Sequence, residues 1–313
     1  MRTFIHTFLL ACTLAFGMHH SAQAEELPRE VVINGVEFIH VPEGWFWYIV
    51  GGGKLKDIGA KKAPWYKEYK TWLDGYYIAK YEARARDFVR FMNSGEARFA
   101  SQYPPGDAEN CTVRSYPNGE YYLGDPTRDL PAAQLTWDLA DEFARWMGFR
   151  LPTEAEWEKA ARGTDRRIWP WGNEYPDDTF AQYGTESDCH AAPVDHFRNG
   201  VSPYGVYNMA GNVLEFVADW FNEEFDLSMR DGQRNPALAT HGTTGDGEIN
   251  VPARIVKGGR WGSPATAMHI HARRLHRPDD PFICFGLRFA VDVDTVRKHL
   301  KNGTARIAGQ EKR

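Results

Sequence analysis

Cysteine is scarce in this chain. Four cysteines occur among 313 residues, and one of them, Cys12, lies in the apolar segment at the start. The other three, Cys111, Cys189 and Cys284, allow one internal disulfide at most, and the sequence leaves open which pair would bond. A small fold held together by several disulfides is therefore excluded.

Long apolar runs are also missing after the first residues. The run at residues 4–18 is shorter than the roughly 20 residues that a membrane-spanning helix needs. Arg2 precedes this run, and Ala22-Gln23-Ala24 follows it with the small-x-small pattern of a secretory cleavage site. We predict that residues 1–24 are a removed signal peptide and that residues 25–313 act in the periplasm without inserting into the membrane.

Positive charge is not in excess, since 37 Lys and Arg stand against 42 Asp and Glu, for a formal net charge of −5. This balance gives no sign of a nucleic-acid partner. The chain also contains no Gly-rich phosphate-binding loop and no nucleophile-elbow sequence. The signatures of the common nucleotide-binding and serine-hydrolase sites are thus missing.

Apolar and aromatic residues are plentiful, at 42% and 14% of the chain, which is enough for a substantial core. The 29 Gly and 18 Pro are spread along the whole length, and no internal repeat or low-complexity tract is visible. We predict a single loop-rich domain over residues 25–313, with a core at 31–293 and a basic C-terminal tail at 294–313.

Local patterns predict a few regular elements. Asn34-Gly35 lies between β-prone flanks and is typical of a hairpin turn. A helix is expected over 83–93, with Gly95 available to end it. Further strands are expected at 72–81, 254–257, 269–271 and 287–291.

Two more helices are indicated by clearer signals. Apolar residues recur at helical spacing from Leu139 to Met147, and Gly148 ends the pattern. Thr153-Glu154-Ala155-Glu156 then has the form of a capping box that opens a second helix, which ends at Gly163. Residues 222–250 are polar and too long for an ordinary connection, so this segment is either functional or mobile.

The segment Tyr207–Phe216, YNMAGNVLEF, follows neither a strand nor a helix periodicity. Its apolar residues are interrupted by Asn208, Gly211, Asn212 and Glu215. One interpretation is a turn with a solvated carboxylate. The other is a calcium site, because Ca²⁺ takes six to eight oxygen ligands and a glycine lets the chain bend so that carbonyls converge.

Several motifs carry a resemblance to a known family. They are FRLPTEAEWEKAARG at 149–163, WPWGNEYP at 169–176, APVDHF at 192–197, YGVYNMAGNVLEFVADWF at 204–221, KGGRW at 257–261 and FGLRFA at 285–290. In this order they are similar to the formylglycine-generating-enzyme family, also called the sulfatase-modifying-factor family. The resemblance covers about residues 31–293 and implies a single α+β domain of low regularity that is related to C-type lectins.

The resemblance also implies a bound calcium ion. Its ligands would be the Asn208 side chain, the main-chain carbonyls of Gly211 and Val213, and the Glu215 carboxylate, with Asn212 unassigned. The remaining apolar residues, Tyr207, Met209, Leu214 and Phe216, would anchor the segment in the core. For a second family calcium site the sequence offers only Asp178, Glu186 and Asp188 without a clear register, so we do not assign it.

The copper-binding cysteine pair of the family's oxidases is absent from the region where the resemblance places it. No cysteine lies between Gly258 and Ile283, and Cys284 adjoins the FGLR motif. Because copper(I) requires soft thiolate ligands, we predict that this chain does not generate formylglycine and is not an enzyme of that kind.

Histidines and arginines fill the same region, and each group has two interpretations. On a strand, His269 and His271 would share a face and, with His276 nearby, could bind a metal; otherwise they are histidines without metal. The arginines either line a groove for an acidic ligand or form structural ion pairs with buried carboxylates. They are Arg260, Arg273, Arg274, Arg277 and Arg288.

Three functions are therefore in competition. The first is a catalytically inactive periplasmic protein with structural calcium that resembles the TagR type and regulates type VI secretion by binding the periplasmic domain of a membrane Ser/Thr kinase or another secretion component. The second is a periplasmic enzyme of oxidative, pyoverdine-type siderophore maturation, with His271 or His276 as the best candidates for acid-base work. The third is a lectin-like ligand-binding module, which rests on fold analogy alone.

Overall fold

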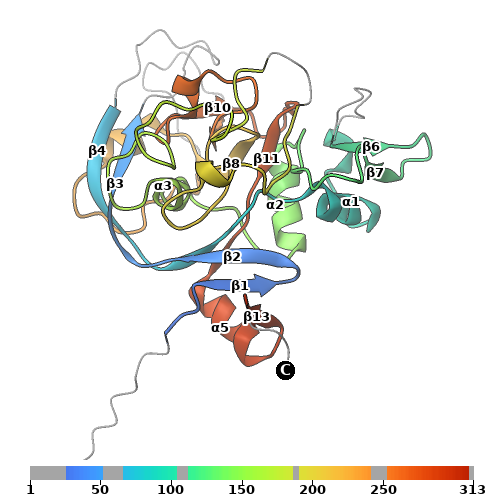
Figure 1. Cartoon of the computed structure of the whole chain (residues 1–313), viewed down its shortest axis with the longest axis horizontal. Coiled ribbons are helices and arrows are strands. Elements are labelled where there is room, and N and C mark those ends of the chain that lie inside the picture. Colours follow the sequence, from blue (N-terminus) through green and yellow to red (C-terminus); the bar gives the residue numbers. More distant parts are fainter. Residues whose placement is uncertain (1–25, 52–65, 104–111, 186–189, 241–251, 310–313) are drawn as a thin grey trace, which may run out of the picture.

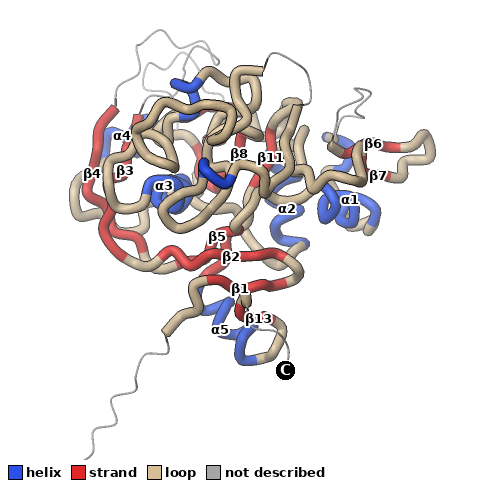
Figure 2. The backbone as a smooth tube through the Cα atoms, in the orientation of Figure 1, coloured by secondary structure: helices blue, strands red, loops and turns tan. Residues whose placement is uncertain are grey.

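The computed structural model describes residues 26–51, 66–103, 112–185, 190–240 and 252–309. The expected signal peptide, Cys111, Cys189 and the possible calcium ligands Glu186 and Asp188 lie outside these ranges. Most of the described chain forms loops between short helices and strands (Figure 2). The predicted α+β class with little regular secondary structure is confirmed.

A five-stranded sheet joins the two ends of the described chain. Its strand order is β12-β5-β2-β1-β13, and every neighbouring pair is antiparallel. The strands are β1 (Glu30–Ile33), β2 (Val36–Val41), β5 (Tyr76–Ala79), β12 (Ala290–Asp292) and β13 (Ala305–Ile307). Helix α5 (Val293–Lys301) contacts β5, β12 and β13 at the lower end of the molecule in Figure 1.

A second sheet carries the segment with the irregular periodicity. Its order is β10-β9-β8-β11, with β8 and β11 parallel and the other pairs antiparallel. The strands are β8 (Leu214–Trp220), β9 (Arg254–Lys257), β10 (Arg274–His276) and β11 (Phe285–Leu287). Two separate ribbons complete the strands, β3 (Gly44–Gly51) with β4 (Tyr66–Leu73), and β6 (Val113–Ser115) with β7 (Tyr121–Leu123).

The helices are α1 (Ala85–Asn93), α2 (Trp137–Trp146), α3 (Glu154–Arg162) and α4 (Glu223–Ser228), in addition to α5. The capping box predicted for α3 is confirmed, since the Thr153 side chain accepts from Glu156 N and the Glu156 side chain accepts from Thr153 N. These two bonds satisfy helix N–H groups that have no partner within the helix.

The hairpin at Asn34-Gly35 is also confirmed. Both residues have positive φ, 50° and 82°, and Ile33 pairs with Val36 across the two-residue turn. This backbone twist matches that of the flanking strands, which is why Asn-Gly is favoured there.

Three strand predictions need correction. The strand expected at 72–81 is two strands, because the chain breaks at Asp74-Gly75 and continues into a different sheet. The strand expected at 287–291 is likewise divided between β11 and β12. Residues 269–271 are not a strand: a 3₁₀ helix, Ala265–Met268, runs up to His269, and Ala272 N donates to His269 O in a tight turn.

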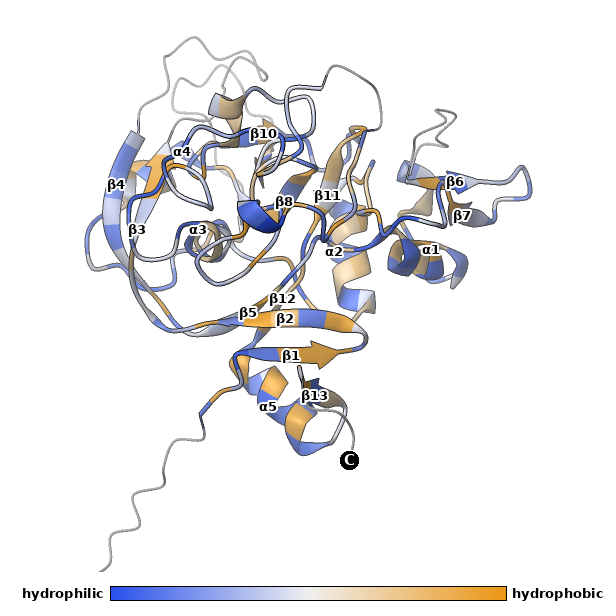
Figure 3. Cartoon of the chain, in the orientation of Figure 1, coloured by the Kyte–Doolittle hydropathy of each residue, from blue (hydrophilic) through white to orange (hydrophobic). Residues whose placement is uncertain are grey.

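Buried apolar residues of the described chain form three clusters, and each of the two larger ones contains residues of β8. The first contains Phe38, Phe88, Phe143 and Phe289, and the second contains Trp157, Val217 and Ile270. In Figure 3, hydrophobic colouring dominates strands β1 and β2, which contribute Val31, Ile33 and Phe38 to these buried positions. Burial of such side chains contributes roughly 1.5 to 3 kcal/mol each.

A buried ionic network ties α3 to the second sheet. Glu154 accepts from Arg273 Nε at 2.5 Å, from Tyr48 Oη at 2.8 Å and from Lys257 Nζ at 3.2 Å. Arg273 also pairs with Asp226 on α4. Burial opposes the ionisation of Glu154, but the cations of Arg273 and Lys257 lower its pKa to about 2.

The same network extends one helical turn further along α3. Glu158 accepts from Lys257 Nζ at 3.4 Å, from Arg162 Nη2 at 3.1 Å and from Ile49 N at 3.0 Å. The side chains of Glu158, Arg162 and Lys257 are at most 2% exposed. The fold therefore holds α3 against β3 and β9 with charges that have no access to water.

Removing one partner from this network should be costly, because it leaves buried charges without compensation. We expect Arg273→Met to lower the free energy of unfolding by about 3 to 5 kcal/mol. Arg277→Met is the matched control, since Arg277 pairs with Asp279 in solvent and its removal should leave stability nearly unchanged. Urea denaturation of the three proteins tests this, and equal midpoints for Arg273→Met and the parent chain would contradict it.

Candidate functional site

The segment Tyr207–Phe216 forms a buried, tightly curved loop that leads into β8. Asn208, Gly211 and Asn212 all have positive φ, of 53°, 78° and 58°. A Cβ atom at Gly211 would lie 2.4 Å from Gln182 O, so only glycine fits there. Met209, Leu214 and Phe216 are buried, as predicted, whereas Tyr207 is only partly buried.

The two asparagine amides of the loop converge on one buried carboxylate, that of Glu82. Asn208 Nδ2 donates to Glu82 Oε2 at 2.7 Å and to Val194 O at 3.0 Å. Asn212 Nδ2 lies 3.1 Å from each Glu82 oxygen. Asn212 also accepts from Ala192 N through Oδ1, so its role is to brace the loop against the APVD segment.

Glu215 lies next to this group and is fully buried. Its Oε1 accepts from Arg288 Nη2 at 2.6 Å, and its Oε2 accepts from Arg288 Nε and Trp157 Nε1, both at 2.7 Å. The pair is bidentate, the geometry in which arginine binds carboxylates most strongly. A solvated Glu215 is thus excluded.

The charges of this cluster are unequal. Glu82 and Glu215 are both at most 2% exposed, and Arg288 is the cation that faces them. Burial, together with the nearby charge of Glu215, raises the pKa of Glu82 to about 8. A carboxyl group with this pKa stays mostly protonated at neutral pH unless a further positive charge lies close to it.

The donors of the loop fit a calcium ion in type. Asn208 Oδ1 is buried and has no hydrogen-bond partner in the described part of the chain. A carboxylate offers about four lone-pair directions, and Glu215 uses three of them. One direction on Glu215 and the amide oxygen of Asn208 are hard oxygen donors of the kind that Ca²⁺ prefers. The calcium site with Asn208, Gly211, Val213 and Glu215 therefore stays a prediction that this geometry can accommodate.

A cavity of about 280 Å³ follows the KGG motif, where the resemblance places the copper cysteines. Gly258 and Gly259 have positive φ, of 92° and 75°, and turn the chain into it. The cationic side chains that line it are Lys257, Arg260, Arg273 and Arg274, and no acidic or cysteine side chain is among its described lining residues. The cavity is therefore suited to anionic groups.

The structure divides the five arginines between the two interpretations. Arg273 and Arg288 form structural pairs with buried carboxylates. Arg277 forms an exposed pair with Asp279. Arg260 and Arg274 line the cavity, where both guanidinium groups approach the Phe282 ring.

The histidines do not form one cluster. His269 and His271 lie side by side, with ring centroids 5.4 Å apart, between Trp169 and Tyr66. His276 instead contacts Asp280 and the Phe285 ring. In the described ranges, no group of three or more His, Cys, Asp or Glu side chains is arranged to hold a metal ion.

The thiol nearest in sequence to this region is inaccessible. Cys284 is fully buried and unbonded, and burial raises its pKa to about 12. A reactive or metal-binding cysteine needs a thiolate, so Cys284 does not replace the missing pair.

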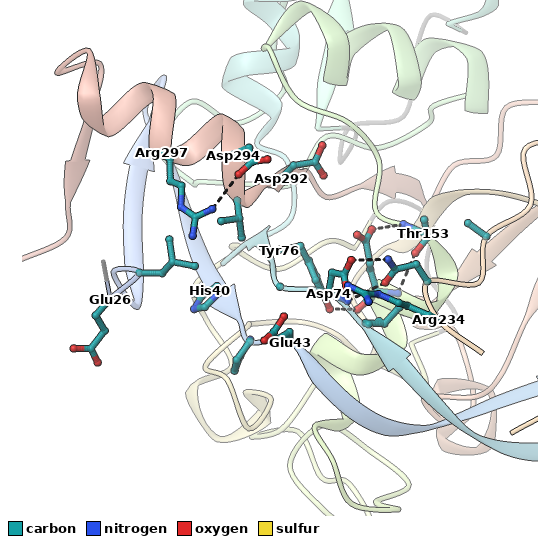
Figure 4. A pocket seen from close by; sticks show the side chains of 18 residues that line it. Glu26, His40, Glu43, Asp74, Tyr76, Thr153, Arg234, Asp292, Asp294 and Arg297 are labelled. Atoms are coloured by element: carbon teal, nitrogen blue, oxygen red, sulfur yellow. Dashed lines mark hydrogen bonds and ion pairs between the residues drawn. The ribbon is translucent and has the colours of Figure 1, made fainter. Parts of the chain in front are cut away.

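A larger hollow of about 960 Å³ lies elsewhere, next to α5 and the β4–β5 connection (Figure 4). Two exposed ion pairs line it: Asp74 with Arg234 at 2.6 Å, and Asp294 with Arg297 at 3.0 Å. Exposed pairs of this kind contribute little to stability, and no chemistry is evident from this lining.

Comparison with known proteins identifies the family. A model described as "Sulfatase-modifying factor enzyme 1-like domain" matches residues 20–293. The chain belongs to this family. The formylglycine-generating enzyme of Thermomonospora curvata is 36% identical over 180 residues, which cover 52% of this chain and 55% of that enzyme. The chain thus spans about half the length of the bacterial formylglycine-generating enzymes it matches.

Two other similarities extend over most of the chain. The serine/threonine-protein kinase pkn1 of Chlamydia caviae is 24% identical over 250 residues, covering 79% of this chain and 38% of the kinase. The solved structure of PvdO from Pseudomonas aeruginosa has a TM-score of 0.57 and 19% identity, and the match covers 86% of this chain and all of PvdO. The second similarity establishes the shared fold.

The sequence does not indicate that Glu82 and Arg288 contact the loop with the candidate calcium ligands. Glu82 lies more than 120 residues before Asn208, and no local pattern marks it as buried. Arg288 was one of five candidate groove arginines, and only its pairing with Glu215 shows that it is structural. The FGLR motif, which contains Arg288, is the signal in the sequence that distinguishes this arginine from the others.

The neutral His271 ring should make the protein sensitive to acid. Burial, with Lys257, His269 and Arg162 nearby, lowers the pKa of His271 to about 3 in the folded chain. Because the unfolded pKa is about 6.5, the contribution of this group to stability is present above pH 6.5 and lost as the pH falls toward 3.

Replacing His271 by Gln should flatten that dependence. We expect the free energy of unfolding of the parent chain to fall more steeply between pH 6.5 and pH 4 than that of His271→Gln. Denaturant titrations at several pH values measure both slopes, with His196→Gln as the exposed control. Parallel slopes for the parent chain and His271→Gln would exclude a buried neutral imidazole.

Proposed function

We propose that this chain is a calcium-containing, catalytically inactive member of the family that acts in the periplasm by binding a protein partner. The observation that carries the proposal is the cavity after the KGG motif, which has cationic side chains and no cysteine among its described lining residues. Without thiolates, copper(I) lacks its soft ligands.

The partner we propose is the periplasmic domain of a membrane Ser/Thr kinase, within a type VI secretion system. The match to a chlamydial Ser/Thr kinase supports a kinase connection. This chain corresponds to 38% of that protein, so a segment similar to this chain occurs there within a kinase polypeptide. The partner would contact the cavity rim through acidic side chains, which complement Arg260 and Arg274.

Calcium has a structural role in this proposal. Bound at Asn208 and Glu215, with the carbonyls of Gly211 and Val213, the ion would hold the loop that leads into β8. Since β8 pairs with both β9 and β11, ordering this loop would order the cavity wall as well.

The absence of formylglycine chemistry is directly testable. The copper-loaded chain, incubated with a sulfatase peptide that contains the target cysteine, should give no aldehyde product by mass spectrometry. A formylglycine-generating enzyme such as that of Thermomonospora curvata serves as the positive control. Formylglycine in the peptide would refute the inactive assignment.

Partner binding should depend on the charge of the cavity. We expect Arg260→Glu to weaken binding to the kinase periplasmic domain about tenfold or more, because like charges would then meet at the rim. Arg277→Glu is the control, since Arg277 does not line the cavity. Calorimetry in calcium-containing buffer measures both.

Three results would count against this function. They are the absence of binding by the parent chain, equal binding by both variants, and a deletion strain with normal secretion that accumulates an immature siderophore. The last result would favour the siderophore-maturation alternative. Binding of the parent chain to a glycan on an array would favour a lectin-like module over both the secretion and the siderophore function.

A further inference from the structure

The orientation of the Asn208 amide is determined by two acceptors. Its Nδ2 donates to Glu82 Oε2 at 2.7 Å and to Val194 O at 3.0 Å, so both amide hydrogens are used. The side chain is 3% exposed, and its Oδ1 is buried without a partner. A buried carbonyl oxygen without a hydrogen bond is costly and uncommon.

The reverse orientation of this amide is excluded by the same contacts. If oxygen and nitrogen were exchanged, Asn208 Oδ1 would face Val194 O, a main-chain carbonyl that has no proton to donate. The Asn208 oxygen must therefore point away from Glu82 and Val194.

We propose that Glu82 is a positioning residue for the calcium ion, and this rests on the calcium site of the proposed function. Glu82 does not need to touch the ion. Its carboxylate binds the nitrogen side of Asn208 and thereby presents Oδ1 to the cation, in the way that carboxylates orient metal ligands from behind.

Asn212 makes the arrangement rigid. Its Nδ2 binds both oxygens of Glu82, and its Oδ1 accepts from Ala192 N at 2.8 Å. Glu82 comes from the connection between β5 and α1, so it links the loop to a distant part of the chain. The carboxylate of Glu82 thus has one fixed rotamer from which to hold Asn208.

The test compares Glu82→Gln with the parent chain by thermal unfolding in excess chelator and in calcium. In chelator, the two Tm values should be similar, because glutamine has nearly the same shape as glutamate and its oxygen still accepts from the asparagine amides. In calcium, the Tm of Glu82→Gln should be the lower one, since one acceptor oxygen holds the Asn208 amide less firmly than two and calcium affinity falls about 10- to 100-fold.

Two further variants separate positioning from other roles. Glu82→Asp keeps the carboxyl group but shortens the side chain by one methylene. A loss of calcium affinity in this variant identifies orientation as the cause, and this result can be used even if Glu82→Gln does not fold. Glu142→Gln removes a buried carboxylate on α2 that pairs with Arg98, and it should leave calcium affinity unchanged.

Calorimetric titration with calcium chloride gives the affinities. A parent chain that binds no calcium would refute the calcium site and this role together. Normal binding by the parent chain and by both Glu82 variants would refute only the role of Glu82. A Tm of Glu82→Gln that is lower by the same amount in chelator and in calcium would make Glu82 a structural residue.

Discussion

The ion pair between Arg288 and Glu215 holds the two main sheets together. Arg288 lies between β11 and β12, and Glu215 lies on β8. The guanidinium group binds both carboxylate oxygens and also donates to Ala79 O at the end of β5 and to Tyr207 O. One buried side chain therefore connects the five-stranded sheet, the four-stranded sheet and the loop with the candidate calcium ligands. Its loss would leave two main-chain carbonyls without this donor and the Glu215 carboxylate without its cation in the interior.

The second ionic network, around Glu154, has a comparable role on the other side of β8. Lys257 and Arg273 reach α3 from β9 and from the turn before β10, and Arg273 continues to α4. In a fold with so few regular elements, backbone hydrogen bonds alone specify the arrangement of the loops poorly. Buried charges with fixed geometry supply that specificity, because a misplaced partner costs several kcal/mol.

These two networks also explain how the candidate cavity can change its chemistry within a constant fold. Four cationic residues line the cavity, and two of them, Lys257 and Arg273, are engaged in structural pairs. Arg260 lies in the segment 260–272, which forms no strand of a sheet, and Arg274 follows at the first position of β10. Side chains within 260–272 can therefore differ without disturbing the pairing of β10 with β9.

The sequence by itself determined the elements with strong local signals and the family. The Asn34-Gly35 turn and the Thr153 capping box depend on backbone groups within a few residues, and the family motifs can be read in order along the chain. Asn208 and Glu215 could also be identified from the sequence as candidate ligands, because they belong to these motifs. Tertiary structure alone decided what surrounds them: Glu82, Arg288 and Trp157 come from distant segments, and their contacts depend on how the sheets pack. His269 and His271 have the spacing of one strand face, and periodicity alone does not reveal the 3₁₀ helix that ends just before them.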